Sequence, residues 1–299
     1  MNILITGATG FIGSNLLKKL IQSNHNLFCT LRENEDNPYG ENKVKSIKLH
    51  SDNINDSIKF FEDNKIEGVI HLAAYVLSGN QEPKDIEILV NSNIKFGTIL
   101  LEVATQANVK WFINTGTYWQ NYNSLDYSPV NLYAATKQAF ENIAKFYYET
   151  NNIMFCTLRL FDTFGKNDTR NKIFNLWDKI SKSGEVLDMS CGEQIMDFSY
   201  IDDIVDAYIL LTDYLHNDSE LVKKGDVFYL QSSERYSLKE LSKIFEKVTS
   251  TKLNINWGGK PYKDREVMEP ILSNKIIPGF KHKITLKKGI YKMFKEKKC

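Results

Sequence analysis

The stretch Thr6-Gly7-Ala8-Thr9-Gly10-Phe11-Ile12-Gly13 decides how this chain folds. A short apolar strand is predicted directly before it, over residues 2–6, and helical apolar spacing begins directly after it, over residues 14–22. In the pattern GxxGxxG the first glycine permits a tight turn, the second lets the backbone approach a pyrophosphate, and the third lets the helix pack close to the sheet. A helix N-terminus also presents free N–H groups to phosphates. This strand–turn–helix context predicts a dinucleotide site. Its predicted contacts are Gly7, Thr9, Gly10, Phe11, Ile12 and Gly13.

Strand and helix patterns alternate along the first half of the chain. Further strands are predicted over residues 27–31, 68–72, 111–115 and 154–160. Further helices are predicted over residues 91–107 and 132–149. This alternation favours an α/β fold of the Rossmann type, a doubly wound parallel sheet with helices on both faces.

The pattern changes after Phe164. Residues 166–188 are polar with helical spacing, residues 198–203 read as a strand and turn before a helix to residue 215, and a strand over 227–231 precedes a helix over 237–248. We also expect an amphipathic terminal helix over residues 287–298. The predicted division is a nucleotide-binding domain of residues 1–164 with a return segment 197–231. A smaller substrate-binding cap is predicted from residues 165–196 and 232–299.

Composition excludes several other classes of protein. Lys plus Arg is 38 and Asp plus Glu is 37, so the clustered positive charge of a nucleic-acid surface is not expected. The four cysteines lack CxxC spacing, which indicates free thiols in a reducing compartment and no metal site. The longest apolar stretch, residues 69–77, is too short to cross a bilayer. Because strand-like residues begin at Asn2, no signal peptide is expected and we predict a cytoplasmic protein without a membrane partner.

The end of the second predicted strand bears on the choice of nicotinamide cofactor. NAD specificity usually needs an acidic residue there to bind the ribose 2′-hydroxyl. Here the strand ends Thr30-Leu31-Arg32, and Arg32 can pair with a 2′-phosphate. We therefore predict NADPH, with NAD as the alternative. The competing interpretation is an ordinary surface arginine, since Glu33 follows directly.

Tyr133 and Lys137 lie four residues apart on a predicted helix, and so on one face. A free tyrosine has a pKa near 10, and a neighbouring ammonium is expected to lower it. Tyr133 would then exchange a proton with a carbonyl oxygen. The alternative is a half-buried tyrosine beside a solvated lysine. Thr115 ends the preceding strand, and its hydroxyl is predicted to bind the same substrate oxygen; Thr117 is the neighbouring candidate.

Taken together with further motifs along the chain, these residues resemble the extended short-chain dehydrogenase/reductase family, in its nucleotide-sugar epimerase/dehydratase branch. The similarity covers nearly the whole chain. The motifs are TGATGFIG at 6–13, HLAA at 71–74, Asn93 in NIKFGTILL, YAATK at 133–137, RLFDTFG at 159–165 and GEQIMDFSYIDDIVDAY at 192–208.

The resemblance implies roles for individual residues. Asp52 would lie near the adenine, and Ala73, between Leu72 and Ala74, near the cofactor ribose or phosphates. The other implied roles are cofactor binding by Asn93, acid–base catalysis by Tyr133, a hold on the nicotinamide ribose by Lys137, and substrate binding by Thr117, Asp162 and Arg265. Asp162 stands where family members usually have a substrate-binding asparagine. Arg265 stands where an arginine of the cap usually grips the substrate diphosphate.

Three departures from the family pattern bear on the reaction. Gly116-Thr117 follows Thr115 where 4,6-dehydratases carry an Asp-Glu pair, so dehydration lacks its acid and base. Epimerases that keep NAD tightly bound through both half-reactions have an acidic residue at the end of the second strand. Here Leu31-Arg32 stands in its place, and an NADPH that dissociates fits a net reduction better. Met196 replaces an arginine that normally contacts the diphosphate.

The sequence is most similar to nucleotide-sugar 4-ketoreductases of the CDP-abequose and CDP-paratose synthase type. This implies hydride transfer from NADPH to C4 of a nucleotide-linked 4-keto-6-deoxyhexose, in deoxysugar biosynthesis for surface polysaccharide such as lipopolysaccharide. Tyr133 would protonate the resulting alkoxide while Thr115 stabilises its charge. The alternatives are an NAD-dependent nucleotide-sugar 4-epimerase, a reductase of a non-nucleotide carbonyl substrate, and a non-catalytic NADP-binding regulator, although such regulators typically lose the Tyr or Lys.

The resemblance also implies a homodimer built on a four-helix bundle. The apolar residues on the two helices concerned are Ile99, Leu100, Val103, Phe140, Ile143 and Phe146. The sequence leaves open whether these side chains face a second subunit or the sheet.

Overall fold

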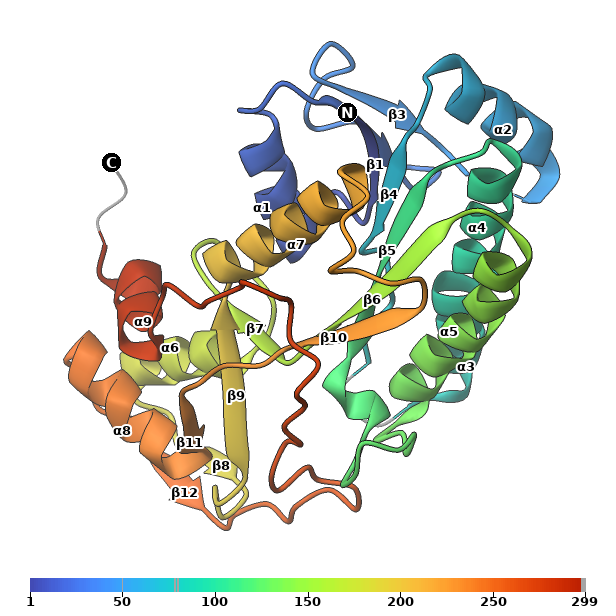
Figure 1. Cartoon of the computed structure of the whole chain (residues 1–299). Coiled ribbons are helices and arrows are strands. Elements are labelled where there is room, and N and C mark those ends of the chain that lie inside the picture. Colours follow the sequence, from blue (N-terminus) through green and yellow to red (C-terminus); the bar gives the residue numbers. More distant parts are fainter. Residues whose placement is uncertain (50, 78, 80, 297–299) are drawn as a thin grey trace.

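A computed structural model describes residues 1–49, 51–77, 79 and 81–296 of the chain. Within this part, seven parallel strands form one central sheet, which Figure 1 shows running through the upper half of the molecule. In spatial order they are β10 (Asp226–Leu230), β6 (Met154–Leu160), β5 (Trp111–Thr117), β4 (Gly68–His71), β1 (Asn2–Thr6), β2 (Asn26–Thr30) and β3 (Val44–Ile47). The strand order reverses between β1 and β4, the position at which open α/β sheets bind ligands.

Helices cover both faces of this sheet (Figure 1). On one face, α1 (Phe11–Leu20) packs against α7 (Ile201–His216). The other face carries α2 (Ile54–Asp63), α3 (Pro83–Val90), α4 (Phe96–Gln106) and α5 (Leu132–Thr150), with the short turns η1 (Ser51–Asn53), η2 (Asn91–Lys95) and η3 (Tyr118–Gln120). Alternate residues of β5 divide between the faces, since Ile113 packs toward α1 and α7 while Phe112 packs toward α4 and α5. The predicted Rossmann-type fold is confirmed.

A smaller group of elements lies at the carboxyl ends of the strands (Figure 1). Strand β9 (Ile195–Tyr200) pairs in parallel with β7 (Asp162–Phe164) and antiparallel with β11 (Arg235–Ser237). Strands β8 (Leu187–Met189) and β12 (Ile255–Trp257) pair separately. The helices of this group are α6 (Ile173–Ser183), α8 (Leu238–Thr249) and α9 (Leu286–Phe294). Their core is aromatic, because Phe174, Trp177, Phe245 and Phe294 contact one another.

Several element boundaries differ from the predicted ones. The helix predicted over residues 91–107 begins instead with a π-turn, Asn91–Lys95, that joins α3 to α4. Of the predicted helical segment 166–188, only α6 is helical, because Gly184 adopts a left-handed conformation that ends the helix. Strands β3, β7, β8, β11 and β12 and helices α2 and α3 were not predicted. The predicted terminal helix forms as α9, where Ile290 is fully buried.

Two predictions made from the composition concern the cysteines and the membrane. Cys29, Cys156 and Cys191 are free thiols, and Cys299 lies outside the described residues. No helix in the described ranges combines the length and apolar character needed to cross a membrane.

Candidate active site

A pocket opens at the carboxyl ends of the central strands. Its walls come from the segments after β4, β5 and β6, from the first turns of α1 and α5, and from the loop before α6. The lining residues are Ile12, Leu72, Ala74, Val76, Thr115, Gly116, Thr117, Tyr118, Trp119, Tyr133, Lys137, Leu160, Phe161, Asp162, Thr163, Arg170 and Lys172. The fold thus brings the predicted residues Thr115, Thr117, Tyr133, Lys137 and Asp162 to one place.

The glycine-rich turn has the geometry of a phosphate cradle. Gly7 has φ +68°, and a Cβ there would lie 2.8 Å from the backbone nitrogen of Ala73. A Cβ on Gly13 would lie 2.2 Å from the carbonyl oxygen of Gly7. Gly10 caps α1 without a side-chain hydrogen bond, and Thr9 and Gly10 are exposed, so the first N–H groups of α1 stay available to an anion. These residues fit the pyrophosphate of a dinucleotide.

Thr6 and His71 fix the loop beside this turn. The Thr6 hydroxyl oxygen accepts hydrogen bonds from the N–H groups of Leu72, at 3.1 Å, and Ala73, at 3.0 Å. Its single proton is therefore donated to Nδ1 of His71, at 2.8 Å. This donation requires the neutral Nε2–H form of His71, and burial, which lowers the pKa of His71, favours a neutral ring. Neither side chain was predicted as a functional residue, because their pairing joins two strands that are distant in sequence.

Two predicted cofactor residues lie at the surface. Arg32 has a side chain 86% exposed, and its guanidinium lies 3.8 Å from Glu35. Such an exposed pair contributes little to stability, so Arg32 remains free to exchange partners. Asp52 is exposed in η1.

Asn93 is buried, and its side chain is committed to the protein. Its oxygen accepts from the N–H of Tyr75, and its amide donates to the carbonyl of Tyr75 and to the Thr136 hydroxyl. Thr136 in turn donates to the carbonyl of Tyr133. Asn93 thus supports the helix that carries Tyr133, and both its N–H bonds are used in that support.

Tyr133 and Lys137 are both buried beside the pocket, at 8% and 1% exposure. Burial raises the pKa of Tyr133 and lowers the pKa of Lys137 to about 8. The expected lowering of the Tyr133 pKa by Lys137 is therefore not found, because loss of hydration outweighs any influence of the ammonium. Among the described residues, no hydrogen bond or ion pair holds the Lys137 ammonium, and its nearest aromatic contact is Phe140, at 5.9 Å.

The two threonine candidates have different surroundings. The Thr115 hydroxyl lies 2.6 Å from the hydroxyl of Tyr208 on α7. Strand β5 extends two residues beyond its predicted end, so Thr117 is its last residue. The Thr117 oxygen accepts a hydrogen bond from the N–H of Trp119 and so caps η3.

Asp162 and two cations, Arg170 and Lys172, line the same pocket. Tyr118 donates to the Asp162 carboxylate at 3.2 Å, and burial raises the pKa of Asp162. Arg170 lies 4.2 Å above the ring of Phe11 and pairs with Asp168, while Lys172 lines the pocket beside it. Neither cation was predicted as a site residue, because both lie in an irregular loop inside the segment predicted to be helical.

Arg265 and Met196 do not line this pocket. Arg265 donates to the Ser128 hydroxyl at 2.7 Å, and its guanidinium lies 4.3 Å from the ring of Tyr122. Met196 faces Tyr236 across the pairing of β9 with β11. Next to it, Arg235 of β11 binds the buried carboxylate of Asp197, at 2.8 Å.

A buried ion pair supports the floor of the site. Arg159 donates to Glu141 at 2.8 Å, and each side chain is 9% exposed. Arg159 also donates to Asn121 and Tyr229. The network ties β6 and the segment after β5 to α5, one turn beyond Lys137, and so fixes the relative position of the two walls that carry the predicted catalytic residues.

A family comparison agrees with this architecture. Residues 3–222 match the model of the NAD dependent epimerase/dehydratase family. The chain belongs to this family. It is therefore an NAD(P)-dependent enzyme of the short-chain dehydrogenase/reductase type.

Two relatives and one solved structure are similar to this chain over 90% or more of its length. CDP-abequose synthase of Salmonella muenchen is 29% identical over 300 residues, which cover 99% of this chain and 97% of that protein. CDP-abequose synthase of Yersinia pseudotuberculosis is 29% identical, covering 90% and 92%. Among solved structures, UDP-glucuronic acid 4-epimerase from Bacillus cereus, in complex with UDP-glucuronic acid and NAD, matches with a TM-score of 0.81 at 22% identity and 98% coverage of both chains.

Proposed function

We propose that this enzyme uses NADPH to reduce the C4 keto group of a nucleotide-linked 4-keto-6-deoxyhexose. The observation that carries the proposal is the composition of the pocket. Tyr133 and Lys137 are buried there together, and Asp162 is the sole acidic residue among the described lining residues. The carboxylate pair that dehydration needs is absent from the described end of β5, Thr115-Gly116-Thr117. Full-length similarity to CDP-abequose synthases supports a nucleotide sugar as substrate.

Tyr133 has a proton to give in the proposed reaction. Burial raises its pKa, and ketone reduction consumes a proton at the new hydroxyl oxygen, which a neutral phenol would supply. An epimerase would use the same phenol first as base and then as acid, so net consumption of NADPH is what separates the two reactions.

The nicotinamide, when bound, supplies the hydride. We propose that the turn from Gly7 to Gly13 holds its pyrophosphate, that Lys137 holds its ribose, and that Arg32 binds the 2′-phosphate. The solvent-exposed guanidinium of Arg32 supports this role. Arg32→Ala should raise the KM for NADPH about tenfold and leave the KM for NADH unchanged; an equal change for both cofactors would favour NAD.

We propose that Arg170 and Lys172 bind the substrate diphosphate from inside the pocket. Arg265 is the second candidate, from its present position beside Ser128. Arg170→Ala and Arg265→Ala separate them by their effects on the KM for the sugar nucleotide. If neither these variants nor Lys172→Ala raises KM, the proposed diphosphate contacts are refuted.

The division of the chain follows the same proposal. Residues 1–164 and 197–231 would form the cofactor domain, supported by α7 and β10 joining the central sheet. Residues 165–196 and 232–299 would form the substrate cap, although the boundary at residue 197 falls within β9, which pairs with β7 on one side and with β11 on the other.

We propose a homodimer formed through α4 and α5. Leu100, Val103 and Phe140 are buried within the protomer and face the sheet, whereas Phe146 is 64% exposed. Phe146→Glu should convert the dimer to a monomer in sedimentation experiments. An unchanged sedimentation coefficient would place the contact elsewhere.

The reaction is tested by measuring the oxidation of NADPH or NADH from the absorbance at 340 nm. Purified enzyme, freed of bound nucleotide, is mixed with NADPH or NADH and in turn with the CDP-, dTDP-, GDP- and UDP-linked 4-keto-6-deoxyhexoses. NADPH oxidation with one of them, lost in Tyr133→Phe, supports the reductase and identifies the nucleotide. No oxidation with any of them, together with tightly bound NAD, favours a 4-epimerase, to which the structural similarity with UDP-glucuronic acid 4-epimerase also points.

A further inference from the structure

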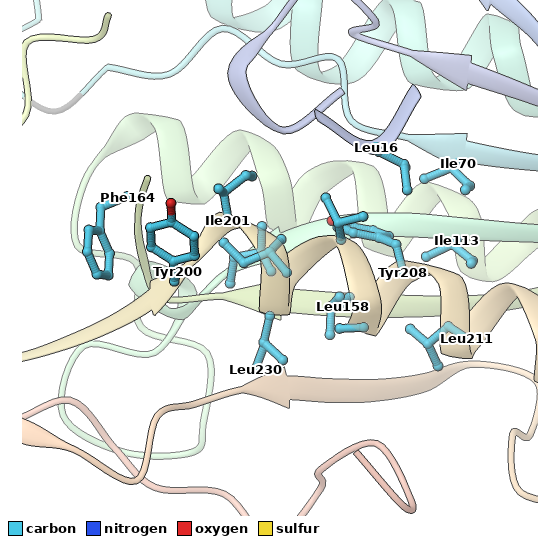
Figure 2. Packing of buried hydrophobic residues seen from close by; sticks show 14 of the residues in the cluster. Leu16, Ile70, Ile113, Leu158, Phe164, Tyr200, Ile201, Tyr208, Leu211 and Leu230 are labelled. Atoms are coloured by element: carbon cyan, nitrogen blue, oxygen red, sulfur yellow. The ribbon is translucent and has the colours of Figure 1, made fainter. Parts of the chain in front are cut away.

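A tyrosine to which the family resemblance assigns no role touches the predicted catalytic threonine. Tyr208 lies on α7, is fully buried, and places its hydroxyl 2.6 Å from the Thr115 hydroxyl. Figure 2 shows its ring near the aliphatic side chains of Leu16, Ile113 and Leu158. In the described part of the chain, neither hydroxyl has another hydrogen-bond partner. Thr115, in contrast to Tyr208, is only half-buried and lines the pocket.

This arrangement decides which hydroxyl donates. If Thr115 donated to Tyr208, the tyrosine proton would remain in an apolar surrounding without an acceptor, which is unfavourable. If Tyr208 donates to Thr115, its proton is satisfied and the Thr115 proton stays free. Since Thr115 borders the pocket, that free proton can reach an oxygen held there. A hydroxyl that already accepts a hydrogen bond is also a better donor.

We propose that Tyr208 is a positioning residue, which holds the Thr115 hydroxyl as a hydrogen-bond donor aimed into the pocket. The inference rests on the proposed function for the identity of the acceptor, the substrate oxygen that gains negative charge during reduction. No proton leaves Tyr208 in this arrangement. The tyrosine fixes the direction of the Thr115 O–H bond, so the donor is in place before the charge develops.

The burial of Tyr208 favours this role over simple packing. A phenylalanine would fill the same apolar space without a polar atom to satisfy. The hydroxyl therefore adds nothing to the apolar packing, and its one contact is a residue of the pocket. Thr117, the other candidate, also keeps a free proton, because its oxygen accepts from the N–H of Trp119, but that donor is a backbone group of η3 and no second side chain positions it.

A double-mutant cycle tests the inference. Tyr208→Phe, Thr115→Val and the double variant are compared with wild type for kcat and KM. We expect Thr115→Val to lower kcat about 100-fold, Tyr208→Phe to lower it about tenfold with little change in KM, and the double variant to match Thr115→Val. Additive losses, or an unchanged kcat in Tyr208→Phe, would overturn the proposal.

Tyr214→Phe is the matched control. It removes a tyrosine hydrogen bond from the same helix, to the carbonyl of Pro278, away from the pocket. Its kcat should equal that of wild type, which separates positioning from a general loosening of α7.

The failure of this inference can be told apart from failure of the proposed function. If wild type reduces no keto sugar, the reductase proposal fails, and the cycle is measured in the 4-epimerase reaction. The same variants are also compared for the free energy of unfolding, which needs no turnover. Independent effects of Tyr208→Phe and Thr115→Val on unfolding would refute the hydrogen bond itself.

Discussion

Lys137 carries a buried positive charge, and replacing it should make the protein more stable and less active. The side chain is 1% exposed, and in the described residues its ammonium has no hydrogen-bond or ion-pair partner. Burial lowers its pKa from 10.5 to about 8. Because each pKa unit is equivalent to 1.36 kcal/mol, the charge opposes folding by about 3 kcal/mol at pH 7. The contact with the ring of Phe140 offsets about 1 kcal/mol of this.

The pH dependence has a defined sign. Below pH 8 Lys137 is charged in both the folded and unfolded states, so the full penalty applies. Between about pH 8 and 10.5 the folded protein loses the proton first, and the penalty fades. Lys137→Met keeps the length of the side chain and removes the charge. It should raise the free energy of unfolding by about 2 kcal/mol at pH 7, and this advantage should shrink toward pH 10.

Urea unfolding of both proteins at pH 7 and pH 10, without nucleotide, measures the effect. Lys145→Met, which removes an exposed lysine from the same helix, is the control and should change stability by less than about 0.5 kcal/mol. The reasoning is refuted if Lys137→Met is less stable than wild type at pH 7, or if its advantage grows with pH. If the same variant also loses activity, Lys137 lowers the stability of the protein but is needed for turnover.

Three further outcomes are expected. The kcat/KM of the free enzyme should fall above about pH 8, because Lys137 then loses the charge with which we propose it holds the cofactor ribose; a profile flat to pH 10 would contradict this. Gly13→Ala should abolish cofactor binding in fluorescence titrations, because its Cβ would meet the carbonyl oxygen of Gly7 at 2.2 Å and backbone cannot yield cheaply. Glu141→Gln should lower the free energy of unfolding by about 3 kcal/mol, since it leaves the buried Arg159 without its partner charge, and Arg159→Met in the same chain should recover part of that loss.

Local sequence signals predicted the centre of the fold and part of its site. The turn from Gly7 to Gly13 and the pair Tyr133 and Lys137 each depend on residues a few positions apart, so their spacing specifies their geometry. The parallel sheet also followed from the alternation of short apolar runs and helical periods. The predicted role of Lys137 in lowering the Tyr133 pKa was wrong, because spacing on a helix does not report burial.

The remaining features depend on contacts between distant segments. Strand β3 has the sequence VKSI and lies at the edge of the sheet. Because this strand is partly exposed, it lacks the continuous apolar run from which the central strands were predicted. Tyr208 lies within a quoted motif, but its hydroxyl meets Thr115 only because α7 returns across the sheet. The substrate contact of Arg265 stays a prediction, and its bond to Ser128 spans 137 positions and leaves no local pattern.

The edge strand β10 also has a consequence for synthesis and for truncation. It reaches β6 only after the chain has built β7, α6, β8, β9 and α7, so the nascent sheet ends at β6 until residue 230 has been made. A fragment of residues 1–164 would expose the bonding edge of Phe155, Cys156 and Leu158, which are buried in the complete protein. Such a fragment should aggregate rather than bind nucleotide, because residues 165–225 must be made before β10 can cover this edge of the central sheet.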